Sequence, residues 1–161
     1  MDIQITPRLL SGAVTPPPSK SMAHRLIIAA ALANGVSTIQ NVAFSQDIKA
    51  TLHCMEQLGA SWSLSDETTV TITGIGGADP SRFSTLPYFD CGESGSTLRF
   101  LIPIALAVAG GGMFTGHGRL MQRPQTPYFD LFREKGIFFE QHGDILTVQG
   151  RLTPGTYALA G

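Results

Sequence analysis

In Pro17-Pro18-Ser19-Lys20-Ser21-Met22-Ala23-His24-Arg25, a rigid proline run leads into an apolar segment, Leu26-Ile27-Ile28-Ala29-Ala30-Ala31-Leu32-Ala33. Ser19 or Ser21 can cap a helix there, and the prolines before it fix the direction of entry. A helix start carries unpaired N–H groups and about half a positive charge. Lys20 and Arg25 add charge of the same sign, which costs free energy unless an anion binds. The stretch therefore indicates a helix that begins at an anion site.

The composition bounds the class of protein. The chain has 161 residues, 43% of them hydrophobic and 14% charged, which excludes disordered and fibrous classes. The formal net charge of −1 argues against a nucleic-acid binder or a membrane-surface binder. The sequence shows no signal peptide and no apolar run of about 18 residues. Cys54 and Cys91 have no metal-ligand spacing, so we expect buried thiols in a reducing cytoplasm.

Hydrophobic periodicity and turn residues predict an alternation of helices and strands. Helices are expected at 21–33, between 45 and 59, at 97–108 and at 127–135. Strands are expected at 2–10, 36–42, 60–64, 69–73, 88–91, 113–115, 137–141 and 145–149. Asn34-Gly35 is expected to end the first helix, and the segment Ser45-Gln46-Asp47 to cap the second. For Asp47 itself, a role in the cap is favoured over that of a general base.

The pattern occurs twice. The segment from Arg25 to Ala33 lies over the segment from Arg99 to Ala107, at an offset of 74 residues, and both halves close with a strand pair. We therefore expect an α+β fold of repeated β-α-β-α-β-β units, which bury their apolar faces on one another. A third unit begins at about Thr153, so the chain is expected to be a fragment of a longer protein.

The repeat places two helix starts in equivalent positions. Ser19-Lys20-Ser21 and Arg25 correspond to Ser94-Gly95-Ser96 and Arg99. If the two helices pack side by side, both starts face one cleft, where the bare backbone of Gly95 allows an oxygen anion to approach. Arg119 and Arg123, from a basic loop at 116–124, can close over that ligand. Arg99 has an alternative role as an ion-pair partner of a nearby acid, namely Asp47, Asp90 or Glu93.

Other kinds of site fit poorly. The segment around Lys20 lacks the glycines of a phosphate-binding P-loop, and Gly92 to Ser96 lacks the last glycine of a nucleophile elbow. The four histidines are scattered, so no metal site is expected; they are His24, His53, His117 and His142.

Three motifs resemble the 5-enolpyruvylshikimate-3-phosphate synthase (3-phosphoshikimate 1-carboxyvinyltransferase) family. They are Pro18-Ser19-Lys20-Ser21 with His24-Arg25, then Gly92-Glu93-Ser94-Gly95-Ser96-Thr97-Leu98-Arg99, then Arg119-Leu120-Met121-Gln122-Arg123-Pro124. The resemblance runs from about Ile5 to Gly161. It implies transfer of the enolpyruvyl group of phosphoenolpyruvate to the 5-hydroxyl of shikimate-3-phosphate, with release of phosphate and with no metal or organic cofactor.

The resemblance also implies a fold and a domain organisation. The family fold is an inside-out α/β barrel of two domains with three units each, so two of six units are present. Residues 1–14 would form a strand and crossover that pair with the missing C-terminal domain. Residues 15–152 would form two units of the substrate-binding domain, and 153–161 the start of a third.

Carried over by position, the resemblance assigns both substrates to Lys20, which is also the catalytic residue. Shikimate-3-phosphate is assigned to Lys20, Ser21 and Arg25. Phosphoenolpyruvate is assigned to Lys20, Glu93, Gly95, Ser96, Arg99 and Arg123. Glu93 stands where many relatives have asparagine, and Ser96 where many have threonine. The extra carboxylate either weakens anion binding or pairs with Arg99.

Acid/base groups and further arginines of the family lie in the later domain, so we expect this chain alone to be inactive. Two alternatives remain open. A UDP-N-acetylglucosamine enolpyruvyl transferase would have Asn in place of Ser21 and commonly a cysteine in the 116–123 loop. A non-catalytic anion-binding module of the same fold would bind the ligands without turnover.

Overall fold

A computed structural model describes residues 3–4, 6–7, 9, 11–77, 79–152 and 154–158. Its helices are α1 (Lys20–Leu32), α2 (Gln46–Gln57), α3 (Gly95–Val108) and α4 (Thr126–Lys135), with single 3-10 turns at Pro80–Arg82 and Leu120–Gln122. Its strands are β1 (Asn34–Ile39), β2 (Ser61–Leu64), β3 (Val70–Ile75), β4 (Tyr88–Asp90), β5 (Gly111–Thr115), β6 (Phe138–His142) and β7 (Ile145–Gln149).

The strands form two sheets with a shared plan. The first sheet has the order β1-β3-β2, and the second has the order β4-β5-β7-β6. In both, the last strand of the unit lies in the middle and pairs antiparallel with its two neighbours. The second sheet has one further strand, β4, which runs parallel to β5. The internal repeat expected from the sequence is present in these pairings.

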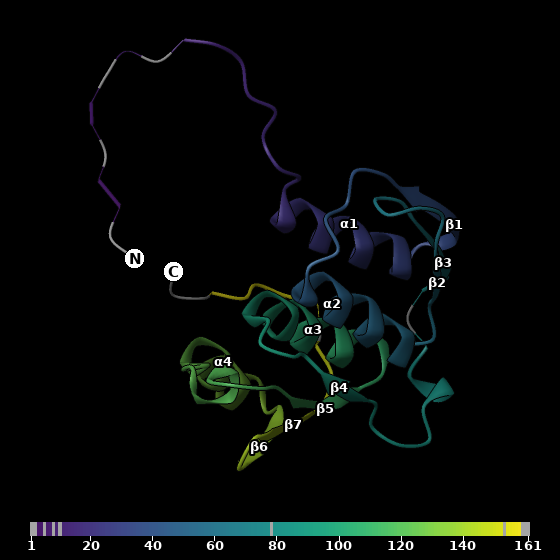
Figure 1. Cartoon of the computed structure of the whole chain (residues 1–161). Coiled ribbons are helices and arrows are strands. Elements are labelled where there is room, and N and C mark those ends of the chain that lie inside the picture. The colour runs from purple at the N-terminus through teal and green to yellow at the C-terminus, as the bar shows by residue number, and fades with distance from the viewer. Residues whose placement is uncertain are drawn as a thin grey trace.

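Three helices stack side by side between the sheets (Figure 1). α1 packs on the first sheet, α3 packs on the second, and α2 lies between them and contacts both α1 and α3. One apolar core runs through all layers, because Ile27, Ile48 and Leu101 of the three helices are each fully buried. α2 also packs against β4, so the two units share a core rather than meeting at a polar boundary.

Cys54 and Cys91 lie at the contact between the units. Both thiols are free and buried, and Cys54 Sγ donates a hydrogen bond to the Asp90 carbonyl at 3.2 Å. A side-chain hydrogen bond to Cys91, together with burial, raises the pKa of the Cys54 thiol above its ordinary value. These cysteines are therefore part of the core, as the sequence predicts.

The side chain of Tyr128 makes a hydrogen bond to α3 that Pro103 cannot make. Pro103 lies inside the helix and has no N–H, so it cannot donate to the carbonyl of Arg99 one turn earlier. The hydroxyl of Tyr128, on α4, donates to that carbonyl at 2.7 Å. Tyr128 therefore replaces the donor that the proline removes and ties α4 to α3.

Two expected boundaries are wrong. Asn34-Gly35 does not end α1 as a glycine cap; Ala33 is the C-cap, and β1 begins directly at Asn34. Glycine suits this start because Gly35 has a φ of +107°. α3 begins at Gly95 rather than Thr97, because Ser94 is its cap.

The two ends of the chain remain predictions. Of the strand expected at 2–10, the described residues 3, 4, 6, 7 and 9 are in no strand, and the others lie outside the described residues. Residues 154–158 are also irregular, and 153 and 159–161 lie outside the described residues.

None of the helices in the described part of the chain is long and apolar enough to cross a membrane.

Candidate functional site

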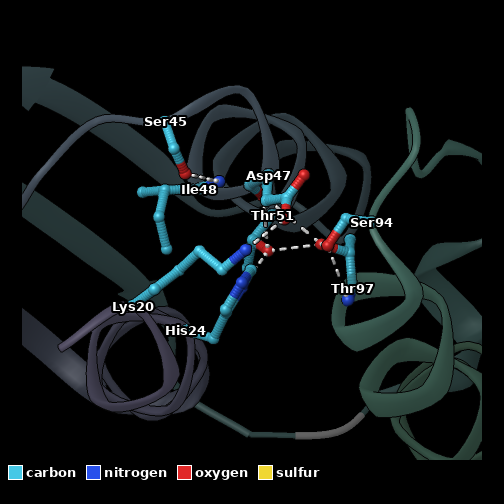
Figure 2. Close-up of polar contacts among 8 residues, drawn as sticks. All are labelled: Lys20, His24, Ser45, Asp47, Ile48, Thr51, Ser94 and Thr97. Carbon is cyan, nitrogen blue, oxygen red and sulfur yellow. Dashed lines mark hydrogen bonds and ion pairs between the residues drawn. The ribbon is translucent and has the colours of Figure 1, made fainter. Parts of the chain in front are cut away.

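The first turns of α1, α2 and α3 meet in one place (Figure 2), and each of these helices is capped by a serine. The side chain of Ser19 accepts from the Met22 amide at 3.3 Å, Ser45 from Ile48 at 3.4 Å and Ser94 from Thr97 at 3.2 Å. The first turns of α1 and α3 contain no acidic residue, so their positive ends are not neutralised from within the helix. The meeting point is therefore electrostatically suited to an anion.

Asp47 is the acidic group at this point, and its role differs from the expected one. Ser45, not Asp47, caps α2. The Asp47 carboxylate instead accepts from Lys20 Nζ at 2.7 Å (Figure 2). More than half of the Lys20 side chain is exposed, so the ion pair is open to solvent. Lys20 is thus held at the meeting point and can exchange this partner for a ligand.

Arg25 and Ser21 lie on the exposed side of α1. The Arg25 guanidinium donates to the Ser21 carbonyl at 2.8 Å and lies over the ring of Phe100, 5.1 Å from its centroid. Phe100 belongs to α3, so this cation–π contact also joins α1 to α3. The guanidinium keeps donors for a ligand, because among the described residues its one hydrogen bond is to the Ser21 carbonyl.

Gly95 and Arg123 are in contact at the start of α3. A Cβ added to Gly95 would lie 3.1 Å from Arg123 Nη1, so the arginine covers the bare backbone of this glycine. Arg99, one turn further on, donates through Nε to Gln125 at 3.5 Å, and Gln125 donates to the Arg123 carbonyl at 3.3 Å. The suggested ion pair of Arg99 with Asp47, Asp90 or Glu93 is absent from the described residues.

Glu93 and Ser96 flank Gly95 and are both exposed. The carboxylate of Glu93 lies against Gly118 in the loop after β5, where an added Cβ would approach Glu93 Oε1 to 3.1 Å. In the same loop, His117 pairs with Asp90 at 3.1 Å. Glu93 therefore stays near the α3 start as an unneutralised carboxylate among the described residues.

A hollow of about 850 Å³ opens beside these helix starts, between α2 and the loops that follow β4 and β5. It is lined by Gln46, Asp47, Lys49, Ala50, His53, Asp90, Gly92, Glu93 and His117. Of the residues assigned from the sequence, it includes Glu93 alone. The assigned cations lie beside this hollow rather than around it.

The sequence reasoning missed the residues that connect the helix starts. His24 Nδ1 lies 2.8 Å from Thr51 Oγ1, and Thr51 Oγ1 lies 2.8 Å from Thr97 Oγ1 (Figure 2). The shared spacing of these contacts is apparent only once the packing of the helices is known. Lys20 and Asp47 are 27 residues apart, as are His24 and Thr51, and each pair is one helical turn from the other.

Burial lowers the pKa of His24 below its ordinary value of 6.5. The charges around the ring act in both directions, since Asp47 raises this pKa while Lys20 and Arg25 lower it. His24 is therefore neutral near pH 7. Among the described residues no group of three or more potential ligands is placed to hold a metal ion.

Comparison with known proteins places this geometry in a family context. The sequence model of the family described as EPSP synthase (3-phosphoshikimate 1-carboxyvinyltransferase) matches residues 5–152. The chain is similar to 3-phosphoshikimate 1-carboxyvinyltransferase of Clostridium novyi, with 42% identity over 99% of this chain and 38% of that protein. The enzyme of the same name from Clostridium perfringens strain 13 is 42% identical over 98% of this chain and 37% of its own length.

A solved structure agrees with the sequence relatives. EPSP synthase from Acinetobacter baumannii superimposes with a TM-score of 0.69 at 26% identity, covering 86% of this chain and 32% of that one. The chain thus spans somewhat more than a third of the length of the relatives that it matches.

Proposed function

This chain belongs to the EPSP synthase family, and from that premise we propose that its three joined helix starts bind the two phosphorylated acids of the enolpyruvyl transfer reaction. The reaction moves the enolpyruvyl group of phosphoenolpyruvate to the 5-hydroxyl of shikimate-3-phosphate and releases phosphate. The observation that carries the proposal is that Asp47 links Lys20 to the α3 start. Its carboxylate accepts from Lys20 Nζ, its carbonyl lies 3.4 Å from Thr97 Oγ1, and Arg123 contacts Gly95 at that same start. Both substrates are anions, and such cations and helix ends stabilise them.

For the individual residues we propose the roles that membership of the family implies. Lys20 contacts both substrates, leaving Asp47 when an anion arrives. Ser21 and Arg25, on the exposed side of α1, bind shikimate-3-phosphate. The α3 start at Gly95 and Ser96, together with Arg99 and Arg123, binds phosphoenolpyruvate, with Glu93 at the edge of that subsite.

We also propose that these residues form one wall of the site. The relatives are more than twice as long as the matched segment, and the part that they carry beyond it supplies the opposite wall. The acid/base groups belong to that part, so the 161 residues by themselves bind substrate and do not turn it over. A cytoplasmic location accords with this metabolic role.

Titration calorimetry tests the binding. Shikimate-3-phosphate and phosphoenolpyruvate are titrated separately into the chain and into its Lys20→Ala variant. We expect binding by the wild type and at least tenfold weaker binding by the variant, since a charge-assisted contact contributes about 1.5–3 kcal/mol. Lys135→Ala, at the end of α4, is the matched control and should bind as the wild type does. Equal affinity of the wild type and Lys20→Ala for both ligands would contradict the proposal.

A phosphate-release assay tests the second part. With both substrates present, the 161 residues alone should release no phosphate above the uncatalysed background. Release at a rate comparable to that of the longer relatives would show that one wall is sufficient.

A further inference from the structure

A chain of buried hydrogen bonds crosses the three helix starts. It runs from His24 on α1 to Thr51 on α2, then to Thr97 and the cap residue Ser94 of α3, with oxygen or nitrogen separations of 2.8, 2.8 and 2.7 Å (Figure 2). None of these four residues is more than 1% exposed. A polar chain this deep in a core is costly unless its members satisfy one another.

Counting the protons shows which group donates in each hydrogen bond from His24 to Ser94. Thr97 Oγ1 donates to Ser94 Oγ, so its single proton is used. Thr97 can then only accept from Thr51, whose own proton is used in that bond. Thr51 in turn must accept from His24 Nδ1. The Asp47 carbonyl is a more distant acceptor, 3.2 Å from Thr51 Oγ1 and 3.4 Å from Thr97 Oγ1.

The direction fixes the tautomer of His24. The proton lies on Nδ1, and Nε2 carries the bare lone pair. Nε2 is buried and has no hydrogen-bond partner among the described residues, which costs less for a bare acceptor than for an orphaned N–H. The neutral ring also avoids placing a buried cation beside the exposed cations Lys20 and Arg25.

The hydrogen-bond chain joins α1 to α3, two helices that otherwise have little contact. α2 lies between α1 and α3, and the Arg25–Phe100 contact bridges them at the surface. In the interior, Thr51 joins α1 to α3 through hydrogen bonds, beside an edge contact of the His24 ring with Phe100 whose centroids are 6.5 Å apart. Hydrogen bonds of fixed length at both sides of Thr51 set the separation between the start of α1, which carries Lys20, and the start of α3, which carries Gly95.

We propose that His24, Thr51 and Thr97 are positioning residues that hold the starts of α1 and α3 at one separation, so that Lys20 and the amide groups around Gly95 act on the same oxyanion. This inference rests on the proposed function, because it names how the two halves of that anion site are kept together. None of the three residues touches the anion; each acts through Lys20 or through the α3 start.

Two observables test the proposal on the 161-residue chain. The first is the tautomer of His24, read from the nitrogen chemical shifts of the ring in ¹⁵N-labelled protein at pH 7. We expect a protonated Nδ1 and a bare Nε2 in the wild type. A proton on Nε2 would reverse the direction of the chain and overturn the inference without any variant being needed.

The second observable is phosphoenolpyruvate affinity. Thr51→Val keeps the shape of the side chain and removes the hydroxyl, so it should weaken binding about 3- to 10-fold and abolish the preference for Nδ1. Thr51→Ser keeps the hydroxyl and should restore both. Thr147→Val, in β7, is the matched control and should change neither. Thr97→Val cuts the next link and serves if Thr51→Val does not fold.

The outcomes separate this inference from the proposed function. If the wild type binds neither phosphoenolpyruvate, shikimate-3-phosphate nor inorganic phosphate, the anion site itself fails and the inference fails with it. If the wild type binds and Thr51→Val and Thr97→Val bind equally well, only the positioning role is wrong.

Discussion

Glu93 brings a carboxylate to the edge of the proposed anion site. Its side chain is exposed, lies against Gly118 and has no cationic partner among the described residues. The alternative role suggested by the sequence, an ion pair with Arg99, is not realised because Arg99 bonds to Gln125. The negative charge is therefore available to repel an incoming phosphate or carboxylate.

We predict that Glu93→Gln tightens phosphoenolpyruvate binding several-fold at low ionic strength, because two charges a few ångströms apart at the surface interact by about 1 kcal/mol or more. Calorimetry at about 0.01 M and about 1 M salt checks this, since the Debye length falls from about 30 Å to about 3 Å and the gain should disappear. Glu56→Gln, at the far end of α2, is the control. A salt-independent gain would point to shape rather than charge.

His24 makes stability depend on pH in a predictable direction. Its folded-state pKa lies below 6.5, so as the pH falls through 6.5 the unfolded chain takes up the proton first. The free energy of unfolding therefore decreases as the pH falls from about 7.5 towards the folded-state pKa. In His24→Asn this contribution is absent.

Urea unfolding at pH 5.5 and pH 7.5 measures the effect. We expect the stability advantage of the wild type over His24→Asn to be larger at pH 7.5. A difference that does not change with pH would show that His24 has the same pKa in both states. Asp47, Lys20 and Arg25 carry the charges that act on position 24 and are present in both proteins, so the comparison isolates the imidazole itself.

At the residue scale, the sequence could predict the cations but not their partners. Lys20 and Gly95 stand out because each lies at a helix start, a local feature that capping residues reveal. Asp47 and Thr51 could not be assigned, because their contacts with Lys20 and His24 join residues 27 positions apart. Such contacts depend on which helices pack together, and no local pattern encodes that.

At the element scale, the bounds of most helices and strands follow from caps and periodicity. The predicted end of α1 was wrong, because a glycine with a positive φ can either end a helix or lie in a strand. Gly136 ends α4 with a φ of +66°, as expected, whereas Gly35 is the second residue of β1 and has a positive φ there. A glycine permits both conformations, so the choice depends on the pairing of Gly35 with Gly74 in β3.

The junction of α3 with α4 yields a prediction of non-additivity. Tyr128→Phe should reduce the free energy of unfolding by about 0.5–1.5 kcal/mol, because it leaves the Arg99 carbonyl without its donor. In a Pro103→Ala background the same change should cost less, because the N–H of the new alanine can donate to that carbonyl. A double-mutant cycle by urea unfolding checks this; strictly additive effects would contradict the shared-donor explanation.

At the scale of the whole molecule, the repeat was visible in the sequence and the order of the layers was not. The equivalence of the two units follows from residues 25–33 and 99–107. That α2 lies between α1 and α3 depends on side-chain packing over the full core. The second unit also has β4 beside β5, for which the first sheet shows no equivalent in the described chain.

A shared core predicts one cooperative transition. Phe89 of β4 is fully buried and stacks on Phe114, with ring centroids 5.0 Å apart. Phe89→Ala should reduce the free energy of unfolding by about 3–5 kcal/mol. The single tryptophan, Trp62, lies in β2 of the first unit. Its fluorescence therefore follows the unfolding of that unit.

We expect the Trp62 midpoint in urea to fall in Phe89→Ala together with the midpoint from circular dichroism. Met22→Ala, on the exposed side of α1, is a surface control and should leave both midpoints nearly unchanged. An unaltered Trp62 midpoint in Phe89→Ala would show that the units unfold independently.

The two buried thiols make the opening of this core measurable as a chemical rate. Alkylating reagents attack the thiolate, and the raised pKa of Cys54 keeps that form scarce while α2 lies against β4. Labelling of Cys54 must therefore wait for the two units to separate. In excess reagent, the half-life of the unlabelled Cys54 thiol measures the rate of that separation. Mass spectrometry follows the labelling on the native protein without denaturant.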